Sequence, residues 1–370
     1  MKIKLLIAVA ALSTLASCKK DEEPQGEAKL NTVPEFFVEA EAGSYGNTAP
    51  DFRMIADIGD RVIQPQDLDF HSQIDNQLWV INRGNDAQGG TSVTIFNPGK
   101  DDQKTEFRKD QNSWHFMAFP SGIAFSPNLN TWATTANILD ANRRGGSFTG
   151  PSLWSGDLNV YAMPSGGNGS HLDMLHGSPY SMGIAAEKDN VFWVYDGYNE
   201  HLVRYDFVAD HGPGNDDHSD ARVFRYTDVT LKREGTYPHH MVLDDNSKWL
   251  YIADGPGKRI IRVDITTGAK VRDMQLINEL LAEHAEYKGA TVEVVLDKNL
   301  DKPCGIEIVG NRLFVTDNAN GDIIAINTES KTEIGRVKTG SAGITGIVFG
   351  QGKLWYANQT TNGIYVVEPK

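Results

Sequence analysis

The sequence predicts an all-β fold, a six-bladed β-propeller. Two observations carry this prediction. A short apolar strand recurs six times, and four of the copies begin with proline. Five of the copies are followed by a second strand, in which an aromatic residue stands three positions before Asp or Asn. Alternating Val, Ile, Tyr and Phe between Gly and Asn turns are typical of strands and hairpins. Repeats of this kind predict small sheets arranged around a ring.

The two inner strands of each blade follow from these repeats. First strands are expected at 65–70, 120–125, 181–186, 238–243, 303–308 and 344–349. The aromatic and polar pairs of the second strands are Trp79 with Asn82, Trp193 with Asp196, Tyr251 with Asp254, Phe314 with Asp317 and Trp355 with Asn358. Blade two departs from the pattern, because Trp132 is followed by Thr135.

The outer strands are predicted from the apolar runs that follow. Third strands are expected at 92–96, 158–162, 201–206, 259–264, 322–327 and 363–367, and fourth strands at 104–109, 170–175, 222–227, 270–275 and 333–338. No residues remain for a fourth strand in blade six. We therefore expect residues 52–58 to fill that place and close the ring, which removes an exposed edge.

One inserted segment has a different periodicity. Leu276, Ile277, Leu280, Leu281 and His284 are spaced as on one face of a helix. The pattern predicts a short helix packed against the ring.

The first seventeen residues have the pattern of an export signal. Lys2 and Lys4 precede an apolar run at 5–12, and Leu-Ala-Ser at 15–17 comes directly before Cys18. The run is too short for a permanent membrane helix, and the pattern resembles the bacterial lipobox, which implies lipidation of Cys18. We expect a signal peptide at 1–17 and an outer-membrane lipoprotein of a Gram-negative bacterium. An ordinary secretory peptide with a coincidental cysteine is the alternative.

Residues 18–45 are expected to form a flexible tether before a propeller at 46–370. The stretch 19–26 is charged, contains Pro and Gly, and has nothing apolar to bury. Its basic and then acidic run resembles the surface-export signal of Bacteroidetes lipoproteins. Both the cell surface and the periplasmic side remain open.

Charge and cysteine content narrow the possible partners. The formal net charge is −14, and loss of residues 1–17 with Lys2 and Lys4 would make it −16. This balance disfavours nucleic acid and anionic membrane surfaces, so the lipid is the one expected contact with a membrane. A negative net charge is compatible with cations or neutral glycans as partners. The chain has two cysteines, and lipidation of Cys18 would leave Cys304 without a disulfide partner.

The repeat also carries a family resemblance. The first strand followed by a Val/Ile-X-Asp-X-X-Asn strand is similar to NHL repeats over roughly residues 50–370, and the best copy is Leu-Phe-Val-Thr-Asp-Asn-Ala-Asn-Gly at 313–321. The resemblance implies a propeller. It does not imply a function, because propellers host enzymes, binding proteins and scaffolds alike.

One mouth of the ring is the expected binding site, because a concave opening with convergent polar groups is the usual place for a ligand. The start of each first strand lies beside the end of the second, so the residues after the prolines should gather at this mouth. They are Gln66, Ser121, Met182, His239, Cys304 and Thr345. Loops opening there add Trp114, His115, Arg143, Arg144, His176 and Tyr198. The Asp and Asn series is expected mainly to cap turns within its own blades.

His239 and His240 are the most suggestive pair, because neighbours on a strand point to opposite faces and only one can line the channel. Pro238-His239 is similar to a strand of peptidyl-α-hydroxyglycine α-amidating lyases, whose propeller holds zinc with three histidines. Asp196-Gly197-Tyr198-Asn199 is similar to the segment that carries the catalytic tyrosine of those enzymes. The resemblance implies catalytic roles for His239 and Tyr198. His240, the other member of the pair, is a candidate for ligand binding.

The metal set of that family is incomplete here. The positions of its other two histidines hold Ser121 and Thr345, and neither is a usual zinc ligand. A metal at this mouth would therefore need His115 and His176 beside His239. A structural or hydrogen-bonding role for His239 is the stronger alternative.

Two further features allow more than one interpretation. Cys304 is expected to be a small buried residue, with a soft ligand or reactive thiol as the alternative. The acidic loop at 210–220 offers oxygen ligands suited to Ca²⁺ without the spacing of an EF-hand. It is expected on the face opposite the mouth, as a solvated loop or a calcium site. Zn²⁺ and Ca²⁺ are thus the candidate cofactors.

The leading functional hypothesis is a lipid-anchored recognition propeller outside the cytoplasm. Its expected partner is a polar small molecule, glycan, peptide or partner protein, held at the mouth by Gln66, Ser121, Arg143, Arg144, His176, His240, Cys304 and Thr345. The alternative is a metal-dependent lyase or hydrolase at the same mouth. The sequence leaves open whether the protein is an enzyme.

Overall fold

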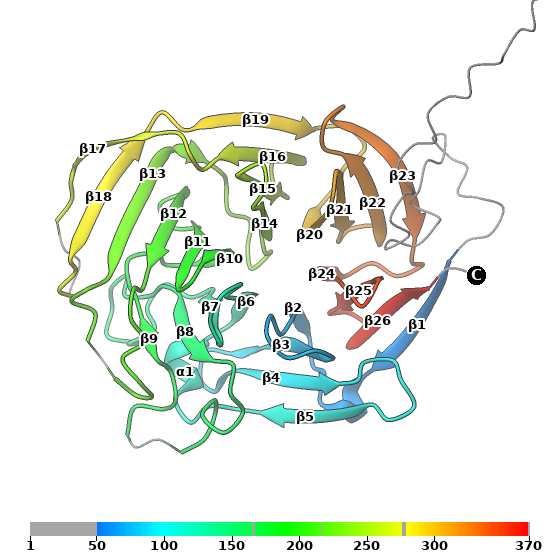
Figure 1. The fold of residues 1–370 in the computed structure, drawn as a ribbon, viewed down its shortest axis with the longest axis horizontal. Helices are drawn as coiled ribbons and strands as arrows, with labels where there is room; N and C mark the ends of the chain where they lie inside the picture. Colours follow the sequence, from blue (N-terminus) through cyan, green and yellow to red (C-terminus); the bar gives the residue numbers. More distant parts are fainter. Residues whose placement is uncertain (1–49, 165–166, 216, 276–278, 369–370) are drawn as a thin grey trace, which may run out of the picture. The chain divides into compact units, whose positions relative to one another are not determined.

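The computed structural model describes residues 50–164, 167–215, 217–275 and 279–368. Six small sheets, antiparallel apart from one parallel pair of strands, follow one another around a ring in this part of the chain (Figure 1). The fold is a six-bladed β-propeller, as the repeats predict. Cys18, the signal region and the tether lie outside the described residues. Among the helices described, none has the length and apolar character needed to span a membrane.

The inner two strands of each blade come from the predicted repeats. The first strands, nearest the axis, are β2 (Pro65–Phe70), β6 (Pro120–Phe125), β10 (Ser181–Lys188), β14 (Met241–Asp244), β20 (Pro303–Val309) and β24 (Ile344–Gly350). The second strands are β3 (Gln77–Asn85), β7 (Thr131–Ala136), β11 (Val191–Asp196), β15 (Trp249–Asp254), β21 (Arg312–Asp317) and β25 (Lys353–Asn358).

The outer strands complete the blades. The third strands are β4 (Gly89–Phe96), β8 (Ser152–Ser155), β12 (His201–Asp206), β16 (Arg259–Asp264), β22 (Asp322–Asn327) and β26 (Gly363–Glu368). The fourth are β5 (Lys104–Arg108), β9 (Asp173–Met174), β13 (Arg222–Thr230), β19 (Thr291–Leu296), β23 (Thr332–Lys338) and β1 (Asp51–Ala56). A 3-10 turn, η2 (Ile58–Asp60), and one short helix, α1 (Ser113–Phe116), lie in the connections.

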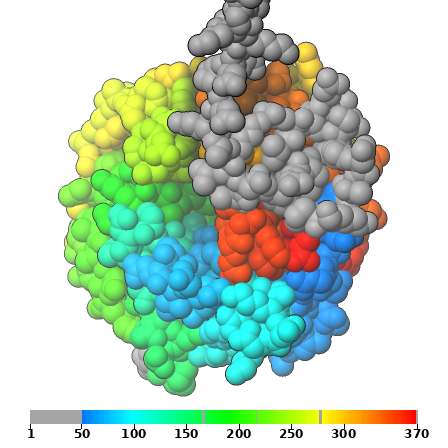
Figure 2. All heavy atoms as spheres, turned by 45° about the vertical axis from the view of Figure 1, so that its right-hand side comes forward, coloured from blue at the N-terminus to red at the C-terminus, as the bar shows by residue number. Residues whose placement is uncertain are grey.

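The ring closes as predicted. β1 pairs antiparallel with β26, so Phe52 lies opposite Val367 and Arg53 opposite Val366. The Arg53 guanidinium is 3.0 Å from a Glu368 carboxylate oxygen. Figure 2 shows the red surface of the last blade bordered by blue residues from the beginning of the described chain.

Six apolar clusters hold the blades together, one at each junction between neighbours. The junction of blades one and two, for example, buries Trp79 against Trp132 and Trp154. The other junctions are built in the same way. Because a blade has a neighbour on each side, its central strands are buried on both faces, as in β7 and β11.

The third strand of blade two is not where the sequence analysis placed it. Residues 158–162 form a turn, because Val160 and Tyr161 donate backbone N–H groups to the Asp157 carbonyl and the Asp157 side chain accepts from Asn159. The strand is β8, in which Trp154 pairs with Trp132 of β7.

The outer edge of blade three also corrects the sequence analysis. Residues 270–275 were expected as the fourth strand of blade four, but β19 fills that place. Instead β17 (Ala269–Asp273) forms a hairpin with β18 (Glu283–Lys288), and β18 lies parallel to β13. Blade three thereby gains two strands (Figure 1).

The inserted helix predicted around 276–284 is wrong in its last part. Residues 276–278 lie outside the described residues, and His284 belongs to β18. The strand form is stabilised because the Arg225 side chain of β13 donates to Nε2 of His284 at 2.9 Å.

Candidate functional site

The first-strand residues that were predicted to line the mouth are buried between the blades. Gln66, Ser121, His239, Cys304 and Thr345 each expose 2% of their surface or less. The hydroxyls bridge neighbouring blades. Ser121 donates to the Ser181 carbonyl at 2.6 Å, and Thr345 donates to the Pro65 carbonyl at 3.0 Å. Gln66 donates to the Gln64 carbonyl at 3.0 Å. These side chains therefore join blades instead of forming an open surface.

Burial also accounts for Cys304. The thiol is free and enclosed, and burial raises its pKa well above the ordinary value. A thiol of this kind stays protonated and is a poor nucleophile. The expectation of a small buried residue is confirmed.

Asp196, Asp254 and Asn358 cap turns, as expected. Asp196 accepts from the backbone N–H groups of Tyr198 and Asn199, and Asp254 accepts from Gly257. Asn358 accepts from Thr360 and Thr361. In each case the acceptor sits at the end of a second strand and holds the turn into the third. Asn82 instead accepts from the Ile63 N–H, and Asp317 accepts from the Asp301 and Lys302 N–H groups as well as from Ala319.

The structure places the two residues of the predicted catalytic pair in different surroundings. His239 is enclosed by Tyr195 and Tyr237, with ring centroids 4.9 and 6.2 Å away, and burial lowers its pKa to about 4. Neither ring nitrogen has a hydrogen-bond partner among the described residues. Tyr198 is 56% exposed. A neutral, enclosed histidine is not poised to exchange protons with a ligand at the surface.

The predicted metal set is only partly brought together. The rings of His115 and His176 lie 6.4 Å apart, and Nδ1 of His115 lies 2.9 Å from the Ala141 carbonyl. In the part of the chain that the structure describes, the donor atoms close enough to share one ion belong to His176, His218 and Glu279. His115 and His239 are not in this group.

The two predicted arginines lie at the surface. Arg143 is 3.2 Å from Asp86 and its guanidinium lies over the Trp114 ring. The exposed Arg144 donates its backbone N–H to Asp140. In the contacts that the structure shows, neither arginine touches a residue near the axis of the ring.

A polar cavity of about 230 Å³ lies on the axis and is lined by residues from the first strands of all six blades. Its polar side chains are Asp67, Asp69, Glu307 and His240. His240, not His239, is therefore the member of the histidine pair that lines the channel. Its Nε2 is 2.8 Å from the Ser121 carbonyl, and its Nδ1 is 3.5 Å from Asp67.

The three carboxyl groups bind backbone donors of the neighbouring blades. First strands of adjacent blades belong to separate sheets, so some of their N–H groups need other acceptors. Asp67 accepts from Ile123 at 3.0 Å, and Asp69 accepts from Phe125 at 2.8 Å. Glu307 accepts from the Phe349 N–H at 3.2 Å.

Burial and mutual repulsion shift the pKa values of the titratable side chains that line this cavity. Burial raises the pKa of Asp67 to about 8 and that of Glu307 to about 8, and the neighbouring carboxylates add to the effect in Glu307. The pKa of Asp69 rises to about 7, whereas burial lowers that of His240 to about 4. Such a group titrates together, and at neutral pH it holds exchangeable protons facing the cavity.

The sequence analysis missed these carboxyl groups. A signal was present, because Asp67, Asp69 and Glu307 interrupt first strands that are apolar at the corresponding positions of other copies, as in 120–125. An acidic residue in such a repeat predicts either a bond to the next blade or a ligand on the axis.

The fold is shared with solved structures from Bacteroides. An auxiliary nutrient binding protein from Bacteroides ovatus matches with a TM-score of 0.55 and 11% identity, over 82% of this chain and 69% of that one. A second, from Bacteroides thetaiotaomicron, gives 0.52 and 11%, over 82% and 68%. A protein of unknown function from the same species gives 0.52 and 11%, over 86% and 76%. At this identity the likeness shows the fold alone.

No protein-family model matches the sequence, and no curated protein matches it significantly. The similarity to NHL repeats and to amidating lyases therefore stays a prediction from the motifs quoted above.

Proposed function

We propose that this protein is a lipid-anchored binding propeller that acts outside the cytoplasm and holds a small polar ligand in the axial cavity. The observation that carries the proposal is the convergence of Asp67, Asp69, Glu307 and His240 on one cavity. The predicted mouth residues on the first strands are buried, and in the part of the chain that it describes the structure shows no contact of Arg143, Arg144 or Tyr198 with them, so the cavity is the better candidate for a site.

The chemistry of the cavity indicates the class of ligand. At about 230 Å³ it is smaller than the roughly 300–1,000 Å³ of sites for drug-sized molecules. Carboxyl groups with pKa values of about 7 to 8 can ionise to pair with a cation or stay protonated to donate to a hydroxyl oxygen. An amino sugar, a small amine, a sugar or a metal cation fits these groups.

Two features support the location and the binding role. The region before Cys18 has the pattern of a lipoprotein signal. Two of the matching propellers are described as auxiliary nutrient binding proteins, which agrees with a binding role for such a ring.

The ligand site is tested by thermal unfolding of the purified protein with glucose, glucosamine, small amines and divalent cations. A ligand at a hundred times its Kd stabilises the protein by about 2.7 kcal/mol. We expect at least one class to raise the Tm of the wild type but not of Asp67→Asn, which can keep the acceptor for Ile123 but can no longer ionise. Asp101→Asn, an exposed change of equal charge, is the control. No stabilising compound, or equal stabilisation of Asp67→Asn, would contradict the proposal.

The anchor is tested separately by Cys18→Ser. This variant is expected to leave the membrane fraction while keeping the Tm of the wild type, since the change lies outside the ring. Retention with the membrane after a high-salt wash would contradict the lipid anchor.

A further inference from the structure

Three connections that are distant in the sequence meet at the outer edge of blades two and three. His176 lies between β9 and β10, His218 lies in the long β12–β13 loop, and Glu279 lies between β17 and β18. Their donor atoms all lie within 4.8 Å of one another. The sequence analysis placed the acidic loop on the face opposite His176, but the rings of His176 and His218 are 5.9 Å apart.

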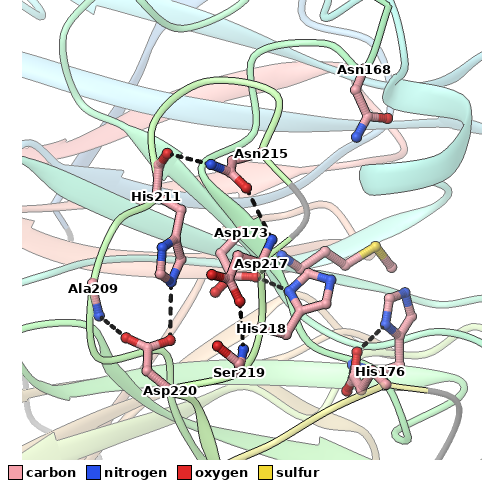
Figure 3. A network of polar contacts seen from close by, with 12 residues as sticks. Asn168, Asp173, His176, Ala209, His211, Asn215, Asp217, His218, Ser219 and Asp220 are labelled. Atoms are coloured by element: carbon pink, nitrogen blue, oxygen red, sulfur yellow. Dashed lines mark hydrogen bonds and ion pairs between the residues drawn. The ribbon is translucent and has the colours of Figure 1, made fainter.

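The acidic loop reaches this place because it folds back against blade two. Gly214 donates its backbone N–H to the His171 carbonyl at 2.8 Å. The carboxylate of Asp220 accepts from the Ala209 N–H and is hydrogen-bonded to the His211 ring. Asp217 accepts from the Ser219 N–H. These carboxylates hold the shape of the loop that presents His218 (Figure 3).

A carboxylate faces each histidine. Nδ1 of His176 is 2.6 Å from Glu279, which also accepts the His176 backbone N–H at 2.9 Å, so an ion held by this pair would take the place of the proton between them. Nδ1 of His218 is 2.5 Å from Asp173. In Figure 3 the His218 ring lies between Asp173 and His176. A carboxylate that fixes a histidine ring in this way is a frequent feature of metal sites.

His176 has an unsatisfied ring nitrogen. Its side chain is 5% exposed, that of Glu279 is 4% exposed, and Nε2 of His176 is buried without a hydrogen-bond partner among the described residues. A buried polar atom without a partner is costly. Phe148 stacks on the ring with centroids 3.5 Å apart, so the histidine cannot readily turn toward solvent.

We propose that His176, His218 and Glu279 form a binding site for a divalent transition metal, with Asp173 orienting His218. Two imidazoles and a carboxylate are ligands that Zn²⁺ accepts. A cavity of about 330 Å³ beside the group, lined also by Phe148 and Asp217, has room for water or another small ligand on the metal. The ion would fasten the β17–β18 hairpin to blades two and three.

The direct test measures Zn²⁺ binding to the full chain after treatment with a chelator, by titration calorimetry. The wild type is expected to bind one Zn²⁺ per chain at this site, in addition to any ion that the axial cavity holds. His176→Ala and His218→Ala are expected to weaken binding at least about 100-fold, because each removes a ligand. Asp210→Asn, an exposed change in the same loop that can keep an acceptor for the Gly212 N–H, and Asp67→Asn, in the axial cavity, are expected to keep the affinity of the wild type at this site. Asp67→Asn also separates this site from the proposed function.

A second readout follows the hairpin. Removing the metal from the wild type should increase amide hydrogen exchange in residues 283–288, and added Zn²⁺ should reverse the increase. In His218→Ala exchange should not respond to Zn²⁺. If His176→Ala fails to fold, the Zn²⁺ affinities of Glu279→Gln and His218→Ala test the proposal in its place. The proposal is overturned if the wild type binds no Zn²⁺, or if these variants bind it as tightly as the Asp210→Asn control.

Discussion

Arg225 is a fully buried guanidinium whose donors meet acceptors from three parts of blade three. It donates to Asp196 at 3.0 Å and to His284 of β18 at 2.9 Å, and it also donates to the Gly177 carbonyl. Burial lowers the pKa of His284, and the nearby guanidinium adds to this effect. A neutral His284 can accept the hydrogen bond. Arg225 therefore ties the added strand β18 to the turn after the second strand.

Replacing Arg225 with Met should destabilise the protein by about 3–5 kcal/mol, because it leaves Asp196 buried without its partner. Arg272→Met is the matched comparison. Its guanidinium is 66% exposed, and its partner Glu286 also accepts from Thr227 and pairs with Lys288. The loss should therefore be about 0–1 kcal/mol. Urea unfolding measures both. Equal losses of unfolding free energy would show that burial does not set the strength of the Arg225 network.

At the scale of single elements, the inner strands were predicted closely, because a repeated apolar pattern marks a strand that is buried on both faces. The outer strands carry less of this signal. β17 is exposed along its whole length, so its sequence does not show which blade it joins. The parallel pairing of β13 with β18 joins distant segments and has no local pattern.

The lack of a local sequence pattern also explains why most of the proposed metal site was missed in the sequence analysis. His176 was recognised as a candidate ligand from its place before a first strand. Its neighbours His218 and Glu279 were not, because only the folded-back loop and the added hairpin bring them near. The axial carboxyl groups differ, since the repeat itself shows them as acidic interruptions.

The closing strand gives a prediction at this scale. Deleting residues up to Ile58 should cost on the order of 3 kcal/mol, at about 1.5–3 kcal/mol for each fully buried side chain. Ala56 is buried, and Phe52 and Ile55 pack against two of the apolar clusters. Deletion of residues 1–45 leaves β1 intact and should not lower the Tm. A longer truncation with the same Tm as this control would show that β1 is not needed for closure.

The pH dependence of stability is a property of the whole molecule, since its buried titratable groups fall into two sets. Burial lowers the pKa of five histidines, so they stay neutral in the fold, and their contribution is lost as pH falls below about 6.5. They are His71, His201, His239, His240 and His284. Burial raises the pKa of Asp67, Asp69 and Glu307, so their contribution is lost as pH rises toward 8. Stability should therefore be greatest near pH 6.5.

The alkaline side is the cleaner test, because the histidines of the unfolded chain are almost fully deprotonated above about pH 7.5. Between about pH 7.5 and 8.5 the free energy of unfolding should fall by at most about 1.4 kcal/mol per pH unit for each carboxyl that stays protonated in the fold. Urea midpoints measured across this range should fall less in Glu307→Gln than in the wild type. Glu329→Gln, an exposed change, should behave like the wild type. A midpoint that does not vary with pH would refute the raised pKa values.

The pairing of β1 with β26 sets the order in which the molecule can be completed. Synthesis makes residues 51–56 more than 300 residues before their partners at 363–368, and chains fold from the N-terminus as they emerge. The sixth blade must therefore wait until residues 363–368 have been made, and until then β1 lacks its partner strand. That delay keeps the nascent chain from closing the ring early, which would suit the export that we propose.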